Sequence, residues 1–161
     1  MFGGIDVGKN GGIAIITKEG LKLHTIPKIG NKVDYLELNG IFNDLPKSCI
    51  FCIEDVHSIF GSSAKSNFNF GEIKGILTGM VISNGFRWEL VQPKKWQKEV
   101  WTNADMVKKP NGRTDTKGTS LLAAKRIFPD QTFLATQRSR KPHDGLFDAS
   151  LIAEYCRRTY S

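Results

Sequence analysis

Four acidic positions are the strongest candidates for chemistry in this sequence. Asp6 ends an apolar run among glycines, and Glu54 or its neighbour Asp55 ends a second apolar run. Asp144 and Asp148 are four residues apart, a spacing that places both on one face of a helix. Carboxylates that lie close together cannot all stay ionised without cations. Two Mg²⁺ ions bound there could stabilise the attacking and leaving oxygens of a phosphodiester displacement.

Each acid also has a purely structural interpretation. Asp6 suits a simple turn, and Asp144 suits the N-terminus of a helix because of the helix dipole. Strand alternation alone does not choose between Glu54 and Asp55. Asp148 is harder to explain structurally, because an unpaired acid well inside a helix is costly when it is buried.

The basic residues are concentrated in one third of the chain. Residues 87–141 contain 13 Lys or Arg and five Asp or Glu, a net charge of +8, and the rest of the chain carries −1. This asymmetry is typical of a face that binds a polyanion, although an ordinary solvated basic surface is the alternative. The segment also contains Trp and Phe, which argues against a disordered tail. Candidate DNA contacts within it are Lys94, Lys95, Lys108, Lys109, Arg113, Lys117, Arg138 and Arg140.

The elements that position these residues follow from the apolar patterns. Strands are expected at 2–7, 13–17, 21–26, 49–53 and 86–91, and helices at 34–45, 66–85, after Pro93, at 119–128 and at 143–160, with a mobile loop at 103–118. This order predicts an α/β fold with a mixed five-stranded sheet, three antiparallel N-terminal strands and then two more, flanked by helices. Adjacent central strands would bring Asp6 and Glu54 to one edge, with the last helix packed across it. Gly75 and Gly79 should let the 66–85 helix lie close to the sheet.

Composition sets the broad class. The 161 residues suit a single domain spanning 1–161. No apolar stretch is long enough to span a bilayer and no signal peptide is evident, so a cytoplasmic protein with no membrane partner is expected. Cys49 and Cys52 lie in an apolar run, and with Cys156 as the remaining cysteine we expect buried thiols rather than a metal site or a disulfide.

Four stretches, taken in order and spacing, resemble the RuvC family of Holliday-junction resolvases in the RNase H-like superfamily: IDVGKNGGIAI, IEDV, FNFGEIKGILTGMV and DASLIAEY. The second stretch favours Glu54 over Asp55. The resemblance implies a homodimer that cuts opposed strands of a four-way junction with two Mg²⁺ ions per site, for which Mn²⁺ can substitute. Asp6 would bridge both ions, Glu54 and Asp148 would each bind one, and Lys117, just before a helix, would stabilise the developing phosphorane charge.

The chain departs from the family pattern at three places. The family usually spaces its last two ligands three residues apart, but that position is Gly145; Asp144 or His143 is then the fourth ligand, and we favour Asp144 because it keeps the helical face. The family's aromatic residue that enters the junction centre is replaced by His57; Phe60, three residues later, is our candidate for this DNA contact, with a place in the core as the alternative. Lys74 replaces a family arginine and keeps its charge, and it is a further candidate DNA contact. These departures suggest a phage-type or divergent member, in which case the compartment is the bacterial host cytoplasm; an organellar or nucleoid-associated location stays open.

Three other functions compete with resolution of four-way junctions by paired phosphodiester hydrolysis. Another RNase H-like nuclease could cut branched DNA or an RNA–DNA hybrid, but in ribonuclease H the second acid lies on a helix, whereas Glu54 follows a strand. Kinases of the actin and sugar-kinase superfamily need two such domains to enclose ATP. A non-catalytic junction-binding protein would lack one of the acids, and none is missing. Metal-dependent junction cleavage is therefore the function we expect.

Overall fold

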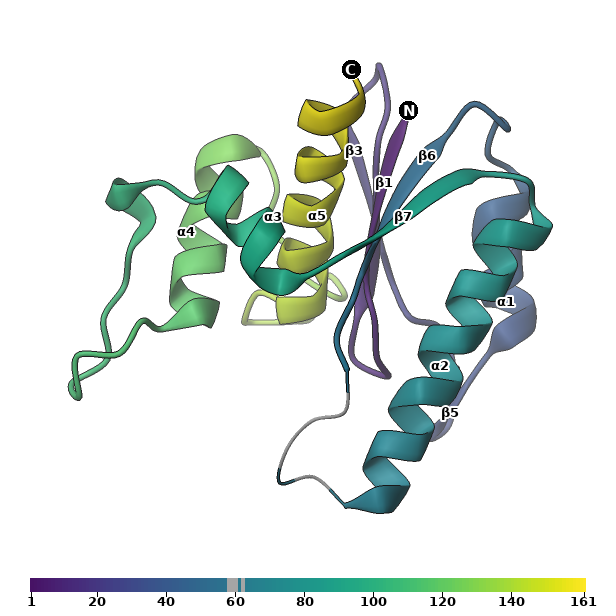
Figure 1. Cartoon of the computed structure of the whole chain (residues 1–161), viewed down its shortest axis with the longest axis horizontal. Helices are drawn as coiled ribbons and strands as arrows, with labels where there is room; N and C mark the ends of the chain where they lie inside the picture. The colour runs from purple at the N-terminus through teal and green to yellow at the C-terminus, as the bar shows by residue number, and fades with distance from the viewer. Residues whose placement is uncertain (58–60, 62) are drawn as a thin grey trace.

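A mixed five-stranded sheet forms the centre of the computed structural model, which describes residues 1–57, 61 and 63–161 (Figure 1). The strand order is β3-β2-β1-β6-β7. The first three strands are antiparallel, and β6 and β7 continue the sheet parallel to β1. The expected α/β architecture is therefore confirmed. The bounds are β1 (Phe2–Asp6), β2 (Gly12–Ile16), β3 (Leu21–Thr25), β6 (Ile50–Glu54) and β7 (Arg87–Val91).

Helices cover both faces of this sheet. They are α1 (Tyr35–Asn43), α2 (Ala64–Ser83), α3 (Pro93–Val100), α4 (Thr116–Ile127) and α5 (Asp144–Tyr160). Helices α1 and α2 pack on one face with Phe51 and Ile53, and α3, α4 and α5 pack on the other with Cys52. Strand β6 is thus buried on both faces, which explains its continuous apolar run. Cys49, Cys52 and Cys156 are buried, as expected for thiols in apolar segments.

A small hairpin of β4 (Lys28–Ile29) and β5 (Lys32–Val33) precedes α1 and was not expected. Each strand has only two residues, which is too few to show the alternation of apolar and polar residues that predicts a strand. The turn between them was visible in the sequence as Gly30 followed by Asn31, and Gly30 adopts a φ of 60°. Asp34 then caps α1, because its carboxylate accepts hydrogen bonds from the backbone N–H groups of Leu36 and Glu37.

The expectation of an irregular mobile loop over 103–118 is wrong in part. The segment contains a 3₁₀ turn, η1 (Asn103–Asp105), and a β-bridge between Lys108 and Thr114, and α4 begins at Thr116. Lys117 consequently lies in the first turn of α4 rather than before the helix. Contacts distant in sequence create this order, so local periodicity could not reveal it.

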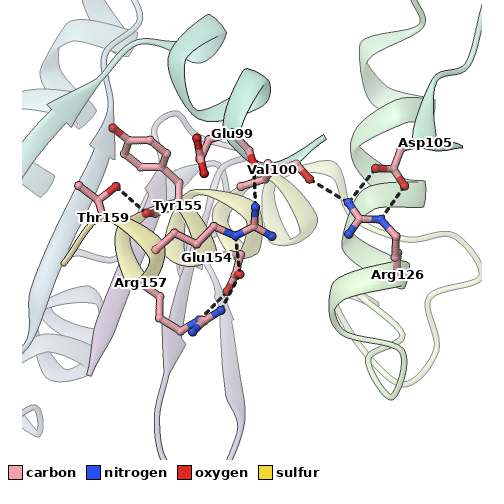
Figure 2. Close-up of polar contacts among 9 residues, drawn as sticks. Glu99, Val100, Asp105, Arg126, Glu154, Tyr155, Arg157 and Thr159 are labelled. Carbon is pink, nitrogen blue, oxygen red and sulfur yellow. Dashed lines mark hydrogen bonds and ion pairs between the residues drawn. The ribbon is translucent and has the colours of Figure 1, made fainter. Parts of the chain in front are cut away.

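An ion pair fastens this segment to the rest of the helical layer (Figure 2). Arg126 on α4 donates from Nε and Nη2 to the two carboxylate oxygens of Asp105, at 3.0 and 2.8 Å, and also to the carbonyl of Val100. The Arg126 guanidinium lowers the pKa of the buried Asp105 to about 2. On the neighbouring α5, Glu154 accepts from Arg157 and Arg158 in the same way. The Arg126 pair ties α4 to η1 and to the end of α3, whereas the Glu154 pairs lie within α5. Helix α4, which carries Lys117, lies beside α5 because buried apolar residues of the two helices pack in one cluster.

Helix α5 lies directly on β1 and β2 because glycines leave it room. A Cβ added at Gly4 would lie 2.2 Å from the carbonyl oxygen of Ala149, and one at Gly12 would lie 2.5 Å from that of Gly145. The last helix therefore crosses the sheet as expected, with its N-terminal turn near the end of β1. The expectation for Gly75 and Gly79 is wrong: both are exposed, with nothing within 4 Å of an added Cβ, because α2 faces the sheet through its apolar residues instead.

Candidate active site

The ends of two parallel central strands bring two acids to the same edge of the sheet. Asp6 is the last residue of β1 and Glu54 is the last of β6, and the register pairs Ile5 with Ile53 immediately before them. The two carboxyl groups lie close enough that each shifts the pKa of the other. Burial raises the pKa of Asp6 well above its ordinary value, and the charges of Glu54, Asp148 and Asp144 raise it further.

Asp148 reaches this edge from the second turn of α5. Burial raises its pKa to about 7, and the charges of Glu54 and Asp144 act in the same direction. The Ser120 hydroxyl and the charge of Lys117 oppose this rise in part. Oδ1 of Asp148 is buried and has no hydrogen-bond partner among the described residues. A buried carboxylate oxygen without a partner is unfavourable in a purely structural role.

Asp144 lies at the start of α5 and is half-exposed. Burial by itself would raise its pKa, but the hydrogen bond and charge of Lys117 outweigh burial and lower it. The ammonium group of Lys117 contacts Oδ2 of Asp144 directly, and the same contact raises the pKa of Lys117. The lysine expected at the site is thus within contact distance of one of its acids.

Gly145 occupies the position three residues before Asp148, where the RuvC family usually has a metal ligand. A Cβ at this position would lie 2.5 Å from the carbonyl oxygen of Asn10 and from the carbonyl carbon of Gly11. No side chain fits there, so this position cannot supply a ligand, and Asp144 and His143 are the remaining candidates for a fourth one. His143 is the N-cap residue of α5, and its Nδ1 is buried without a hydrogen-bond partner in the described structure. Both alternatives keep a physical basis, and the preference for Asp144 stays a prediction.

The carboxylates fit hard divalent cations. Their repulsion and burial hold two of the acids above their ordinary pKa values, so cations would be favoured at this edge. Carboxylate oxygens are the ligands that Mg²⁺ prefers. Across the ranges that the structure describes, however, no three acidic, histidine or cysteine side chains are already close enough to enclose an ion. The carboxylates would therefore have to turn towards a shared ion when it binds.

Trp96 is a residue of this site that the sequence analysis missed. It is buried on α3, and its indole Nε1 donates a hydrogen bond to Oε1 of Glu54 at 3.0 Å. Burial raises the pKa of Glu54, and this hydrogen bond lowers it in part. A buried indole N–H usually has a hydrogen-bond acceptor. The presence of a Trp therefore indicates that some acceptor lies nearby, but the sequence alone does not identify it.

Asp55, the neighbour of Glu54, lies apart from the acid cluster. Its Oδ1 accepts a hydrogen bond from Nζ of Lys74 at 2.6 Å, and this interaction lowers the pKa of Asp55. Lys74 also donates to the carbonyl of Val56. The geometry therefore groups Glu54, rather than Asp55, with the other acids, and it gives Lys74 a local partner.

The remaining basic candidates are spread over several surfaces. Lys108, Lys109 and Arg113 lie on the turn that the β-bridge closes ahead of α4, and all three are exposed. Lys94, Arg138 and Arg140 are also exposed. Lys95 differs, because it pairs with Glu89 at 3.0 Å and lies over the ring of Tyr155. Phe60, the expected junction-contacting aromatic, lies outside the described residues.

Comparisons with known proteins support the fold through structure alone. No protein-family model matches the chain, and no curated protein matches its sequence. The structure is similar to that of T. thermophilus RuvC in complex with a Holliday junction substrate, with a TM-score of 0.58 and 12% identity over 95% of this chain and 90% of that chain. It is also similar to a Thermus thermophilus RuvC structure, with a TM-score of 0.52 and 15% identity over 98% and 95% of the two chains. The chain therefore has a RuvC-like fold.

Proposed function

We propose that the protein is a metal-dependent DNA endonuclease, one nuclease domain spanning residues 1–161, that resolves four-way junctions by hydrolysing two opposed phosphodiesters. The observation that carries the proposal is the meeting of Asp6, Glu54 and Asp148 at one sheet edge, from β1, β6 and α5. The same fold occurs in a RuvC solved with a Holliday junction substrate. The net charge of +7 suits a polyanionic substrate.

The acids would hold two Mg²⁺ or Mn²⁺ ions, with Asp6 shared between them, Glu54 on one and Asp148 on the other. Bound there, the ions would supply a nucleophilic water and stabilise the leaving oxygen. Trp96 keeps one oxygen of Glu54 oriented through its indole N–H. Lys117, which neutralises Asp144 in the free protein, would move its positive charge to the scissile phosphate when DNA binds.

Paired cleavage requires two sites, so the proposal includes a homodimer. Helix α2 offers a surface for it, because Gly75, Gly79 and Ile82 are exposed on the chain and Ile76 is half-buried. Ile76→Glu should therefore give monomers that bind junctions poorly. Light scattering would measure the mass, and an unchanged dimer would place the interface elsewhere.

The deciding experiment is cleavage of a labelled four-way junction beside linear duplex and an RNA–DNA hybrid, in Mg²⁺. We expect symmetric nicks in the junction alone, abolished by Asp6→Asn and Glu54→Gln. Asp55→Asn is the matched control, because this carboxylate pairs with Lys74 instead. Its activity should stay close to that of the unmodified protein.

The other outcomes separate the alternative functions. Cutting of the hybrid instead would indicate a ribonuclease-type activity, and cutting of flaps or forks a broader branched-DNA nuclease. Tight junction binding with no cutting in Mg²⁺ or Mn²⁺ would indicate a non-catalytic junction-binding protein.

No described helix is long and apolar enough to cross a membrane. We place the activity in the cytoplasm, where a DNA substrate would be met.

A further inference from the structure

A groove of about 920 Å³ lies on the α2 side of the acid cluster, in a part of the chain outside the basic 87–141 segment. Its walls come from the turn after β1, the β4–β5 hairpin, the start of α1 and the N-terminal half of α2. Figure 1 shows β5 beside α2. Residues of the hairpin and of this helix line the groove. Its volume is within the range of known ligand sites.

The groove is close to the carboxylates. Lys9, on its wall, is three residues after Asp6, and three residues span at most about 10 Å of chain. On the opposite wall, Phe70 lies one helical turn before Lys74, which is bonded to the residue after Glu54. A polynucleotide held at the acids would therefore pass the mouth of the groove.

The lining combines the three group types that bind an unpaired nucleotide. Tyr35 and Phe70 are half-buried aromatic rings on which a base can stack. Lys9 and Lys32 are exposed cations suited to phosphate. Asn69 adds an exposed amide that can both donate and accept hydrogen bonds.

The charge of the groove favours the same ligand. Among its described lining residues, Glu72 is the single acid, against the two lysines. Lys28, on the hairpin, adds a third cation nearby, because its Nζ donates to Oδ1 of Asn10 on the groove wall at 2.9 Å. The local excess is positive, as a phosphate-bearing ligand requires.

We propose that this groove binds an unpaired nucleotide of the DNA substrate, next to the phosphate that is cut. The inference rests on the proposed nuclease function and specifies its substrate. Bases within a continuous duplex are stacked on one another and cannot reach such rings, whereas a base at an opened branch point can. Junctions with an unpaired nucleotide near the branch should therefore bind more tightly than fully paired ones.

Fluorescence anisotropy without divalent cations tests this on the 161-residue chain, with single-stranded dT oligomers and with junctions that carry one unpaired thymidine at the branch. Tyr35→Leu should weaken binding of both probes about tenfold, the loss expected for one stacked base, and leave linear duplex unchanged. Lys9→Gln combined with Lys32→Gln should weaken binding of the dT oligomer. The slope of the logarithm of the binding constant against the logarithm of the salt concentration should become less negative by about 0.7 for each phosphate contact that is lost.

The matched control is Lys18→Gln combined with Lys22→Gln, which removes two exposed charges at the β2–β3 end, the opposite end of β2 from the groove. This pair should bind the dT oligomer like the unmodified protein. Circular dichroism checks that Tyr35→Leu is folded, and the surface lysine variants keep the test decisive if it is not. The proposal would be overturned if the Lys9/Lys32 double variant and the control double variant bound the dT oligomer with equal affinity. It would also be overturned if the groove variants lost as much affinity for linear duplex as for the dT oligomer.

Failure of the groove and failure of the nuclease function give different results. If the groove variants bind and cut junctions normally while Asp6→Asn abolishes cutting, the groove proposal is wrong and the nuclease function stands. If the unmodified protein cuts no DNA but the groove variants lose affinity for dT, the nucleotide site stands without the nuclease. A groove that serves a protein partner instead would leave every DNA affinity unchanged.

Discussion

Replacing Asp148 with Asn should stabilise the metal-free protein. The carboxylate is buried, its Oδ1 has no hydrogen-bond partner among the described residues, and its pKa is raised to about 7 from an ordinary 3.8. A raised pKa means that ionisation is easier in the unfolded chain than in the folded one. Above pH 4 the unfolded state is therefore favoured progressively, until the folded carboxyl is also ionised near pH 7.

The size of the effect follows from the same values. Each pKa unit corresponds to about 1.4 kcal/mol, so the rise to about 7 destabilises the fold by roughly 4 kcal/mol at pH 8. Asn cannot ionise and removes this cost, but its buried amide recovers fewer hydrogen bonds than water would offer. We expect a net gain in the free energy of unfolding of about 2 kcal/mol, or roughly 4–8 °C in melting temperature.

Thermal denaturation in EDTA at pH 8 and at pH 4 measures this, with Asp144→Asn as the matched control on the same helix. Lys117 lowers the pKa of Asp144, so that substitution should leave stability unchanged or reduce it by less than about 1 kcal/mol. Added Mg²⁺ should stabilise the unmodified protein and have a smaller effect on Asp148→Asn. A variant no more stable than the unmodified protein at pH 8, or a gain that persists undiminished at pH 4, would refute the electrostatic reasoning.

Three further substitutions test the supports of the site. Arg126→Met leaves Asp105 buried and unpaired and should cost about 2 kcal/mol of stability at pH 7, a difference that narrows as the pH falls towards the Asp105 pKa of about 2. Trp96→Phe removes the hydrogen bond to Glu54 and should raise the Mg²⁺ concentration for half-maximal cleavage at least about tenfold. Gly145→Ala places a Cβ against backbone atoms at 2.5 Å and should destabilise by more than about 3 kcal/mol in urea denaturation.

Each of these has a control or a result that contradicts it. Arg126→Lys should keep part of the pairing energy, so equal losses for Lys and Met would argue against the ion pair. An unchanged Mg²⁺ requirement would show that Trp96 only fills space. Gly40→Ala, in α1 with nothing within 4 Å of the added Cβ, should be neutral or stabilising by up to about 1 kcal/mol. A similar loss at Gly40 would remove the steric explanation for Gly145.

Much of the fold could be predicted from the sequence because strand and helix patterns depend on near neighbours. The apolar run before Glu54 and the alternation and glycines around Asp6 were enough to place two acids at strand ends. Parallel pairing of β1 with β6 then brought them to one edge. The spacing of Asp144 and Asp148 likewise set their helical face without reference to any other part of the chain.

Contacts between distant segments decided the rest. The hydrogen bond from Trp96 to Glu54 joins residues 42 positions apart, and the pair of Lys74 with Asp55 chooses between adjacent acids that strand alternation left equal. Gly75 looked like a packing position but faces outward, because only the docking of α2 determines which side of the helix meets the sheet.

The sequence by itself determined which residue types end the strands and open the last helix, since that information is local. Only the tertiary structure decided the partners, burial and charge state of those residues. Asp148 and Asp144 show the difference: one turn apart on the same helix, they have pKa values shifted in opposite directions. Burial acts on the first, and a lysine from another helix acts on the second. Both effects depend on how separate segments pack together, which no local pattern encodes.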